Sequence, residues 1–102
     1  MIAEQLLRGA ENARTGRELA SLLKIDIRDV ARHVEKERRD GAPICAGAMG
    51  SHKGYYLAAD QEELQAYCGR LQKRAGELHK TRRALLENLN QLPAKAETKA
   101  DQ

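Results

Sequence analysis

Apolar residues in the first half of the chain recur at helical spacing in two runs. Within each run the apolar side chains lie three or four positions apart, so they share one face of a helix. A break at residues 24–26 separates the two runs. The pattern predicts two helices joined by a tight turn, with these residues on their apolar faces: Leu19, Leu22, Leu23, Val30 and Val34.

Capping residues define the ends of these two helices. Thr15 lies three residues before Glu18, an arrangement in which the hydroxyl caps the N3 amide and the carboxylate reaches back to the cap amide. The first helix of the pair is therefore predicted to begin at Gly16. Asp26 is expected to cap the second helix, and Asp40-Gly41 is expected to end it.

Shorter patterns flank this helix pair. The apolar positions of Ile2–Leu7 predict a short first helix that ends near Gly9. Pro43–Ala46 and Tyr55–Leu57 are β-compatible runs on either side of a glycine-rich stretch, which predicts a two-stranded hairpin with a long loop. Its two adjacent tyrosines point to opposite faces, so we expect one in the core and the other partly exposed.

The second half of the chain follows a heptad pattern. Asp60 and Glu63 repeat the capping signature, and no further helix breaker appears before Pro93. Apolar residues then step by four and three from residue 64 to residue 92, with Arg82 as the exception. The pattern predicts one long, coiled-coil-like helix that pairs with a second copy through Leu71, Leu78, Arg82, Leu85, Leu89 and Leu92.

Two features of this predicted homodimer stay open. Arg82 either extends to solvent or pairs with Glu77 or Glu87 across the interface. The residues beside the apolar positions show no charge complementarity, so parallel and antiparallel pairing are both compatible with the sequence.

Length and composition limit the classes of function. The chain has 102 residues, of which only 3% are aromatic, and this excludes a large enzyme core. Lys and Arg number 18 against 15 Asp and Glu, so any contact with nucleic acid must be localised. Because no signal peptide or membrane-spanning run is found, we expect a cytoplasmic protein with no membrane partner.

The sequence offers no clear cofactor or metal site. Cys45 and Cys68 are isolated, and both are expected to be buried, reduced thiols. With His52 and His79 they would make four potential zinc ligands, but their spacing matches no familiar zinc module. Neither a Walker A loop, a Rossmann glycine pattern nor a Cys-His-acid arrangement occurs, so we expect no enzyme.

The order helix, turn, helix, glycine-bearing hairpin resembles winged helix-turn-helix DNA-binding domains, especially the biotin-operon-repressor-like and small phage-type members. The resemblance covers about Ile2 to Leu57. It is carried by Glu18-Leu19-Ala20, Leu23, Ile25, Val30, His33-Val34, Gly41-Ala42-Pro43-Ile44 and Gly54-Tyr55-Tyr56-Leu57. It implies a mainly α fold with a small β-hairpin wing, followed by the long helix. The expected domains are 1–59 (winged helix), 60–92 (dimerisation helix) and 93–102 (disordered tail).

The helix after the turn carries the expected DNA-binding residues. Arg28, Asp29, Arg32 and Lys36 repeat at three- and four-residue intervals, so they point the same way, on the face opposite Val30 and Val34. The two arginines are candidates for reading guanine in the major groove, and the lysine is a candidate for the phosphate backbone. The alternative is that these charges only solvate an exposed helix face.

Further contacts are expected from His52 and Lys53 at the hairpin tip and from Arg17 near the start of the preceding helix. The sequence therefore predicts a double-stranded DNA-binding transcriptional regulator that acts as a homodimer on an inverted repeat. The alternative function is a phage-type winged-helix module that binds another protein, including an inhibitor of a nucleic-acid enzyme. Single-strand binding is disfavoured, because two adjacent tyrosines on opposite faces of a strand cannot form one stacking platform.

Overall fold

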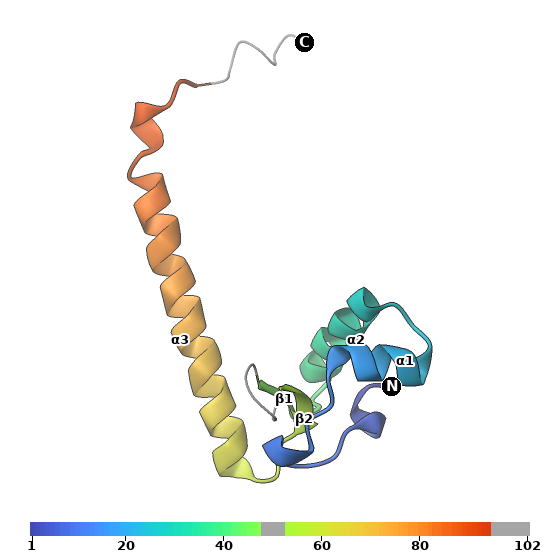
Figure 1. Ribbon diagram of the computed structural model, residues 1–102. Helices are drawn as coiled ribbons and strands as arrows, with labels where there is room; N and C mark the ends of the chain where they lie inside the picture. The colour runs from blue at the N-terminus through green and yellow to red at the C-terminus, as the bar shows by residue number, and fades with distance from the viewer. Residues whose placement is uncertain (48–52, 95–102) are drawn as a thin grey trace. The chain divides into compact units, whose positions relative to one another are not determined.

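The structure is a computed structural model that describes residues 1–47 and 53–94. It is mainly helical, with one two-stranded antiparallel hairpin and a long C-terminal helix (Figure 1). The chain divides into two units, Met1–Gly69 and Arg70–Gln102. The main elements are α1 (Gly16–Leu23), α2 (Ile27–Arg39), β1 (Ile44–Gly47), β2 (Gly54–Leu57) and α3 (Gln61–Leu86).

The predicted caps of α1 and α2 are confirmed. The Thr15 hydroxyl accepts a hydrogen bond from the Glu18 amide at 3.0 Å, and the Glu18 carboxylate accepts one from the Thr15 amide at 2.7 Å. The Asp26 carboxylate accepts a hydrogen bond from the Arg28 amide at 2.8 Å. This backbone bond, followed by the bond to the Arg28 side chain, holds the pKa of Asp26 below its ordinary value. The two helices pack against each other and are joined by a short turn.

The predicted hairpin is also present. β1 and β2 pair from Ile44 opposite Leu57 to Gly47 opposite Gly54. Tyr56 is buried and Tyr55 is only partly buried, so the expected division of the two tyrosines is confirmed. Because neighbouring strand residues face opposite sides, the hairpin contributes to two separate clusters.

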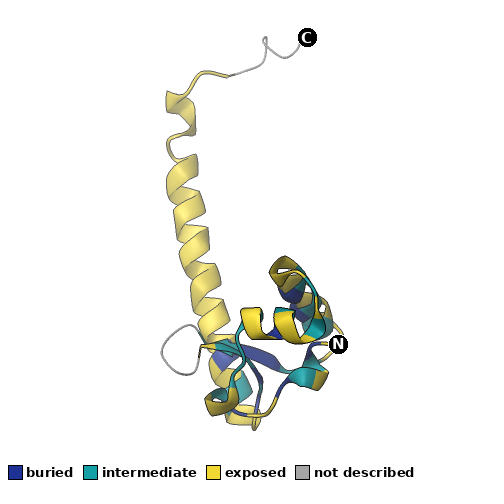
Figure 2. Cartoon of the chain, turned by 45° about the vertical axis from the view of Figure 1, so that its right-hand side comes forward, coloured by how far each residue is buried: buried dark blue, intermediate teal, exposed yellow. Residues whose placement is uncertain are grey.

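The two core clusters lie on the two faces of the hairpin. The first joins the hairpin to α1 and α2, and the second joins it to the first turns of α3 (Figure 2). Leu22, expected on the apolar face of α1, remains 49% exposed. The buried residues of the first cluster are Ile2, Leu6, Leu19, Val30, Val34 and Ile44, and those of the second are Cys45, Tyr56, Ala58 and Tyr67.

The predicted first helix over Ile2–Leu7 is wrong, because only Ala3–Gln5 forms a single 3-10 turn. The Leu7 carbonyl and the Gly9 amide instead bond to the backbone of Leu57 in β2. These contacts, with a backbone pair between Arg14 and Tyr55, draw the segment alongside the hairpin as extended chain. Ile2 and Leu6 therefore enter the core without an α-helix, whereas Leu7 remains 55% exposed.

Glu37 on α2 holds the start of this segment. Its carboxylate accepts hydrogen bonds from the amides of Ile2 and Ala3, both at 2.8 Å. Burial raises the pKa of Glu37, but these bonds and the N-terminal ammonium group outweigh it and hold the pKa below the ordinary value of 4.5. A carboxylate 35 positions away thus takes the place of a local helix cap.

α3 is shorter than the sequence pattern indicated. We expected a helix up to residue 92, but it ends at Leu86 and a separate 3-10 turn covers Leu89–Gln91. The Asn88 side chain donates to the Ala84 carbonyl at 3.2 Å, and the Asn88 amide bonds to Leu85 in 3-10 fashion. Asparagine competes with the helical backbone in this way, so it ends the helix without Gly or Pro.

Three other expectations concern the two cysteines, the C-terminal tail and a membrane-spanning helix. Cys45 is fully buried as expected, whereas Cys68 is exposed, which corrects the prediction that both are buried. The predicted disorder of the tail concerns residues that, beyond Ala94, lie outside the described part of the chain. No helix among the described residues is both long and apolar enough to cross a membrane.

Candidate nucleic-acid interface

The outward side of α2 carries the three cations predicted from the sequence. The side chains of Arg28, Arg32 and Lys36 are 84%, 81% and 74% exposed. Val30 and Val34 lie on the opposite side, in the first core cluster. The structure therefore leaves all three cations accessible to a partner.

Each of these cations is paired with a nearby acid. The closest contacts are 3.4 Å from Arg28 to Asp26, 3.5 Å from Arg32 to Asp29, and 3.2 Å from Lys36 to Asp40. Asp29, predicted as a DNA contact, thus serves as the partner of an arginine. Exposed pairs of this kind contribute only about 0–1 kcal/mol each, so a phosphate or a base edge could replace the acid at small cost.

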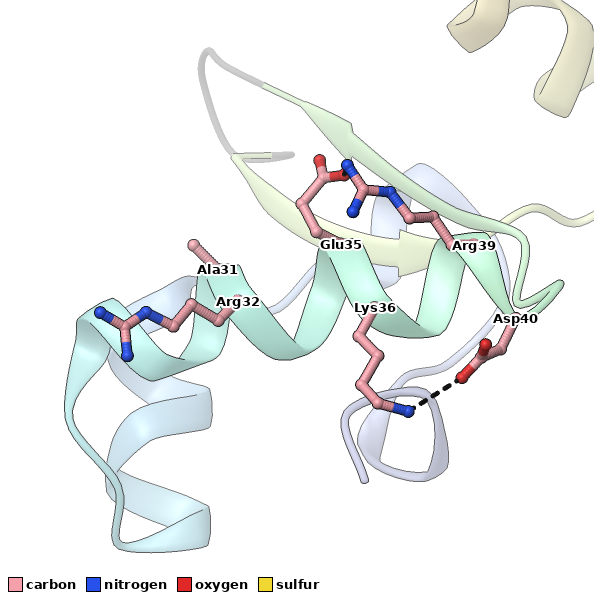
Figure 3. Close-up of a pocket in the computed structure, with 6 residues that line it drawn as sticks. All are labelled: Ala31, Arg32, Glu35, Lys36, Arg39 and Asp40. Carbon is pink, nitrogen blue, oxygen red and sulfur yellow. Dashed lines mark hydrogen bonds and ion pairs between the residues drawn. The ribbon is translucent and has the colours of Figure 1, made fainter.

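A shallow hollow follows the middle of α2. Figure 3 shows Lys36 reaching Asp40 at one end, with Glu35 and Arg39 together on another side of the helix. The small side chain of Ala31 leaves room beside Arg32. Because residues 26–40 hold five Lys and Arg and five Asp and Glu, this surface has local charges but no net charge.

A second hollow joins three elements of the first unit. It is lined by Thr15 and Arg17 from the start of α1, Ile27 from the start of α2, and Lys53 just before β2. Arg17 and Lys53 have no acidic partner among residues 1–47 and 53–94, unlike the cations of α2. Arg17 and Lys53, both predicted from the sequence to contact DNA, thus lie together in one cationic site. His52 lies outside the described residues.

Sequence reasoning missed Ile27 in this hollow. It is the first residue of α2 and is 50% exposed, and it stands against Gly16, where an added Cβ would lie 3.8 Å from the Ile27 side chain. Its neighbours Ile25 and Val30 already lie in or against the first core cluster. The available signal was an apolar residue directly after the cap Asp26, three residues before Val30 and seven before Val34 and so in step with the apolar face of α2.

Arg38 is a cation of α2 with a structural role that the sequence did not reveal. Its guanidinium donates to the Ile44 carbonyl at 2.8 Å and to the Tyr67 hydroxyl at 2.9 Å. The guanidinium carbon also lies 5.2 Å from the centre of the Tyr67 ring. Arg38 therefore links α2, β1 and the first turns of α3 within the first unit, and it holds the candidate interface helix in place.

The predicted pairing face on α3 is only partly retained. Leu71, Leu78 and Leu85 share one helix face and are 38%, 64% and 69% exposed. Leu89 and Leu92 are also exposed, but they lie beyond the end of α3 and cannot extend the same face. Arg82 is exposed and interrupts the leucine face, as its spacing indicated.

Within the described ranges, no three His, Cys, Asp or Glu side chains come close enough to hold a metal ion. Comparisons with protein-family models, curated proteins and solved structures found no significant match.

Proposed function

We propose that this chain is a winged helix-turn-helix transcriptional regulator that binds double-stranded DNA. The single observation that carries the proposal is the hollow in which Arg17 and Lys53, from different elements, meet at the first residue of α2. In helix-turn-helix proteins, the start of the recognition helix meets base edges while neighbouring elements contact the backbone. Cations on both sides of that helix start suit this arrangement.

The charges support a division of labour between the two surfaces. Arg17 and Lys53 have no acidic partner among the described residues, so they suit phosphates. Arg28 and Arg32 are held by acids at 3.4 Å and 3.5 Å, and they can exchange these for hydrogen bonds to guanine. Specificity would then come from α2, and orientation from the hollow.

The same proposal includes a homodimer formed through the leucine face of α3. Three leucines at seven-residue spacing stay exposed, and a partner helix would remove them from water. Two copies related by a two-fold axis would present two copies of α2 to an inverted repeat.

A selection from random DNA duplexes tests the proposal. Wild type should enrich an inverted repeat, and the double variant Arg28→Ala/Arg32→Ala should not, because it lacks the base-reading side chains. Lys24→Asn is the control, since it removes a positive charge outside α2 at a left-handed position that asparagine tolerates. Enrichment that ignores both arginines, or no enrichment at all, would exclude the proposal.

A second candidate function is a module that binds another protein. It is favoured by the net neutrality of residues 26–40 together with the exposed leucines of α3. In that case the leucine face would hold a helix of the partner, and Arg28 and Arg32 would not matter. The same selection separates the two candidates, because this one predicts no enriched duplex.

A further inference from the structure

The most basic part of the chain lies in α3, outside the candidate interface. Residues 70–86 contain six Lys and Arg and a single acid, Glu77. Every residue of this stretch is exposed. The whole chain has a formal net charge of only +3, so this stretch exceeds the charge of the molecule and the rest is slightly acidic.

Three of these six cations, Lys73, Lys80 and Arg83, lie on the side of α3 away from the leucines. Lys73 and Lys80 are seven residues apart and therefore share one face. At ~100° per residue, that face lies about 140° around the helix from Leu78. Arg83 borders this face, which extends about 15 Å from Lys73 to Arg83 at ~1.5 Å per residue, whereas Arg74 and Arg82 lie about 40° from Leu78 on the leucine side. We call Lys73, Lys80 and Arg83 the outer cations.

The outer cations are little neutralised by the chain itself. Lys80 lies 3.6 Å from Glu77, and both side chains are largely exposed. Lys73 and Arg83 have no acidic partner among the described residues. This contrasts with α2, where every outward cation has one.

We propose that the outer cations of α3 bind the phosphate backbone of duplex DNA, independently of its sequence. Three exposed cations on one side of a rigid helix, two of them without an acidic partner among the described residues, complement the charge of a regular row of phosphates. This contact goes beyond the proposed function, because it does not use Arg28, Arg32 or the choice of operator.

Two other acidic partners fit less well. A helix of another protein that covered the leucine face would not reach Lys73 and Lys80, which point away from that face. An anionic membrane would bind α3 with its apolar face inserted, and Arg82 lies within that face. A DNA backbone needs only the outer cations and leaves the leucines available for pairing.

The test uses the full chain and a 20-base-pair duplex of arbitrary sequence, with binding followed by fluorescence anisotropy over a series of salt concentrations. Lys73→Gln/Lys80→Gln/Arg83→Gln should weaken binding at least about tenfold at low salt. It should also reduce the slope of log K against log salt by about 0.9 for each lost contact. Unchanged affinity and slope in this variant would overturn the proposal.

A second variant predicts a gain, which misfolding cannot produce. Glu77→Gln removes the only acid of the stretch and should raise affinity severalfold at low salt. The matched control is Glu62→Gln, an exposed acid of the same helix located about 22 Å away at ~1.5 Å per residue, beyond the range of strong electrostatic interaction. Equal gains from both variants, or none from Glu77→Gln, would contradict a contact at the outer cations.

The same protein is also titrated with vesicles of phosphatidylserine and phosphatidylcholine. Binding to vesicles without binding to the duplex would overturn the proposal in favour of a membrane surface. The proposed function fails separately: it depends on Arg28 and Arg32 with a selected duplex, whereas this inference depends on Lys73, Lys80 and Arg83 with any duplex.

Discussion

Two helices of this molecule are rich in cations but use them differently. On α2, five Lys and Arg are matched by five Asp and Glu within residues 26–40. In residues 70–86 of α3, six Lys and Arg accompany one acid. A count of basic residues alone would treat these helices alike. Nearby acids therefore decide whether a cationic helix attracts anions at long range or only offers hydrogen bonds at contact.

The difference in charge balance bears on the proposed function. A helix with balanced charge has little attraction for DNA in general, so its arginines can discriminate between base pairs once they are in the groove. A helix with an excess of positive charge attracts any phosphate backbone and gains affinity without specificity. We infer that α2 would provide selectivity for a DNA sequence and that α3 would provide affinity for DNA of any sequence.

The largest expected effect concerns the leucine face of α3. Leu78→Ala should raise the dimer dissociation constant more than about 30-fold, because losing a buried leucine costs about 2 kcal/mol or more. Sedimentation equilibrium measures this, with the exposed Gln72→Ala as the control. Added salt should tighten the dimer by screening the positive charge of α3, while it weakens DNA binding. A wild-type chain that stays monomeric at high concentration would rule out pairing.

The next prediction separates an inner cation of α2 from its outer ones. Arg38→Ala should lower the free energy of unfolding by about 1–3 kcal/mol, since it removes hydrogen bonds to Ile44 and Tyr67. Arg39→Ala removes a side chain that is 81% exposed. This variant should change the free energy of unfolding by less than about 0.5 kcal/mol. Urea denaturation compares the two. Equal losses would mean that the bonds of Arg38 do not stabilise the fold.

An inner acid of α2 should respond to pH. The pKa of Glu37 is lowered in the folded state, so its contribution is complete above the ordinary value of 4.5 and is lost as pH falls through the lower folded value. Glu37→Gln should therefore destabilise the chain by about 1 kcal/mol at neutral pH and flatten the acid dependence. Urea denaturation at several pH values measures this. The idea fails if the two proteins lose stability in parallel below pH 4.5.

The smallest effect is expected from a variant that gives α2 an excess of positive charge, as in α3. Asp29→Asn/Asp40→Asn removes the acidic partners of Arg32 and Lys36. Affinity for an arbitrary duplex should rise about threefold to tenfold at low salt. The ratio of the affinity for a selected duplex to the affinity for an arbitrary duplex should fall. Anisotropy titrations with both duplexes measure this ratio of affinities. A gain confined to the selected duplex would show that charge balance does not control selectivity.

Much of the fold was predictable because its signals are local. The caps at Thr15 and Asp26 and the alternation of Tyr55 and Tyr56 depend on residues within a few positions of each other. The shared face of Arg28, Arg32 and Lys36 follows from the helical repeat alone. At the end of α3 the local pattern was overridden by a local competitor, the side chain of Asn88.

The remaining errors and omissions involve partners far apart in the chain. Ile2–Leu7 has the period of a helix, but its backbone is held by Glu37 and β2. The pairing of Arg38 with Tyr67 spans 29 positions, and no sequence pattern signals it. Leu22 has the spacing of a core residue but remains 49% exposed, since no element covers it within the described chain.

The starts of α1 and α2, the presence of the hairpin and the residues that share each helix face follow from the sequence alone, because hydrogen bonds and side-chain periods within a few residues specify them. The charge contrast between residues 26–40 and 70–86 also follows from the sequence. Only the tertiary structure decided that Arg17 and Lys53 meet at Ile27, because that hollow depends on how α1, α2 and the hairpin pack. Packing is set by long-range contacts, which a one-dimensional pattern does not contain.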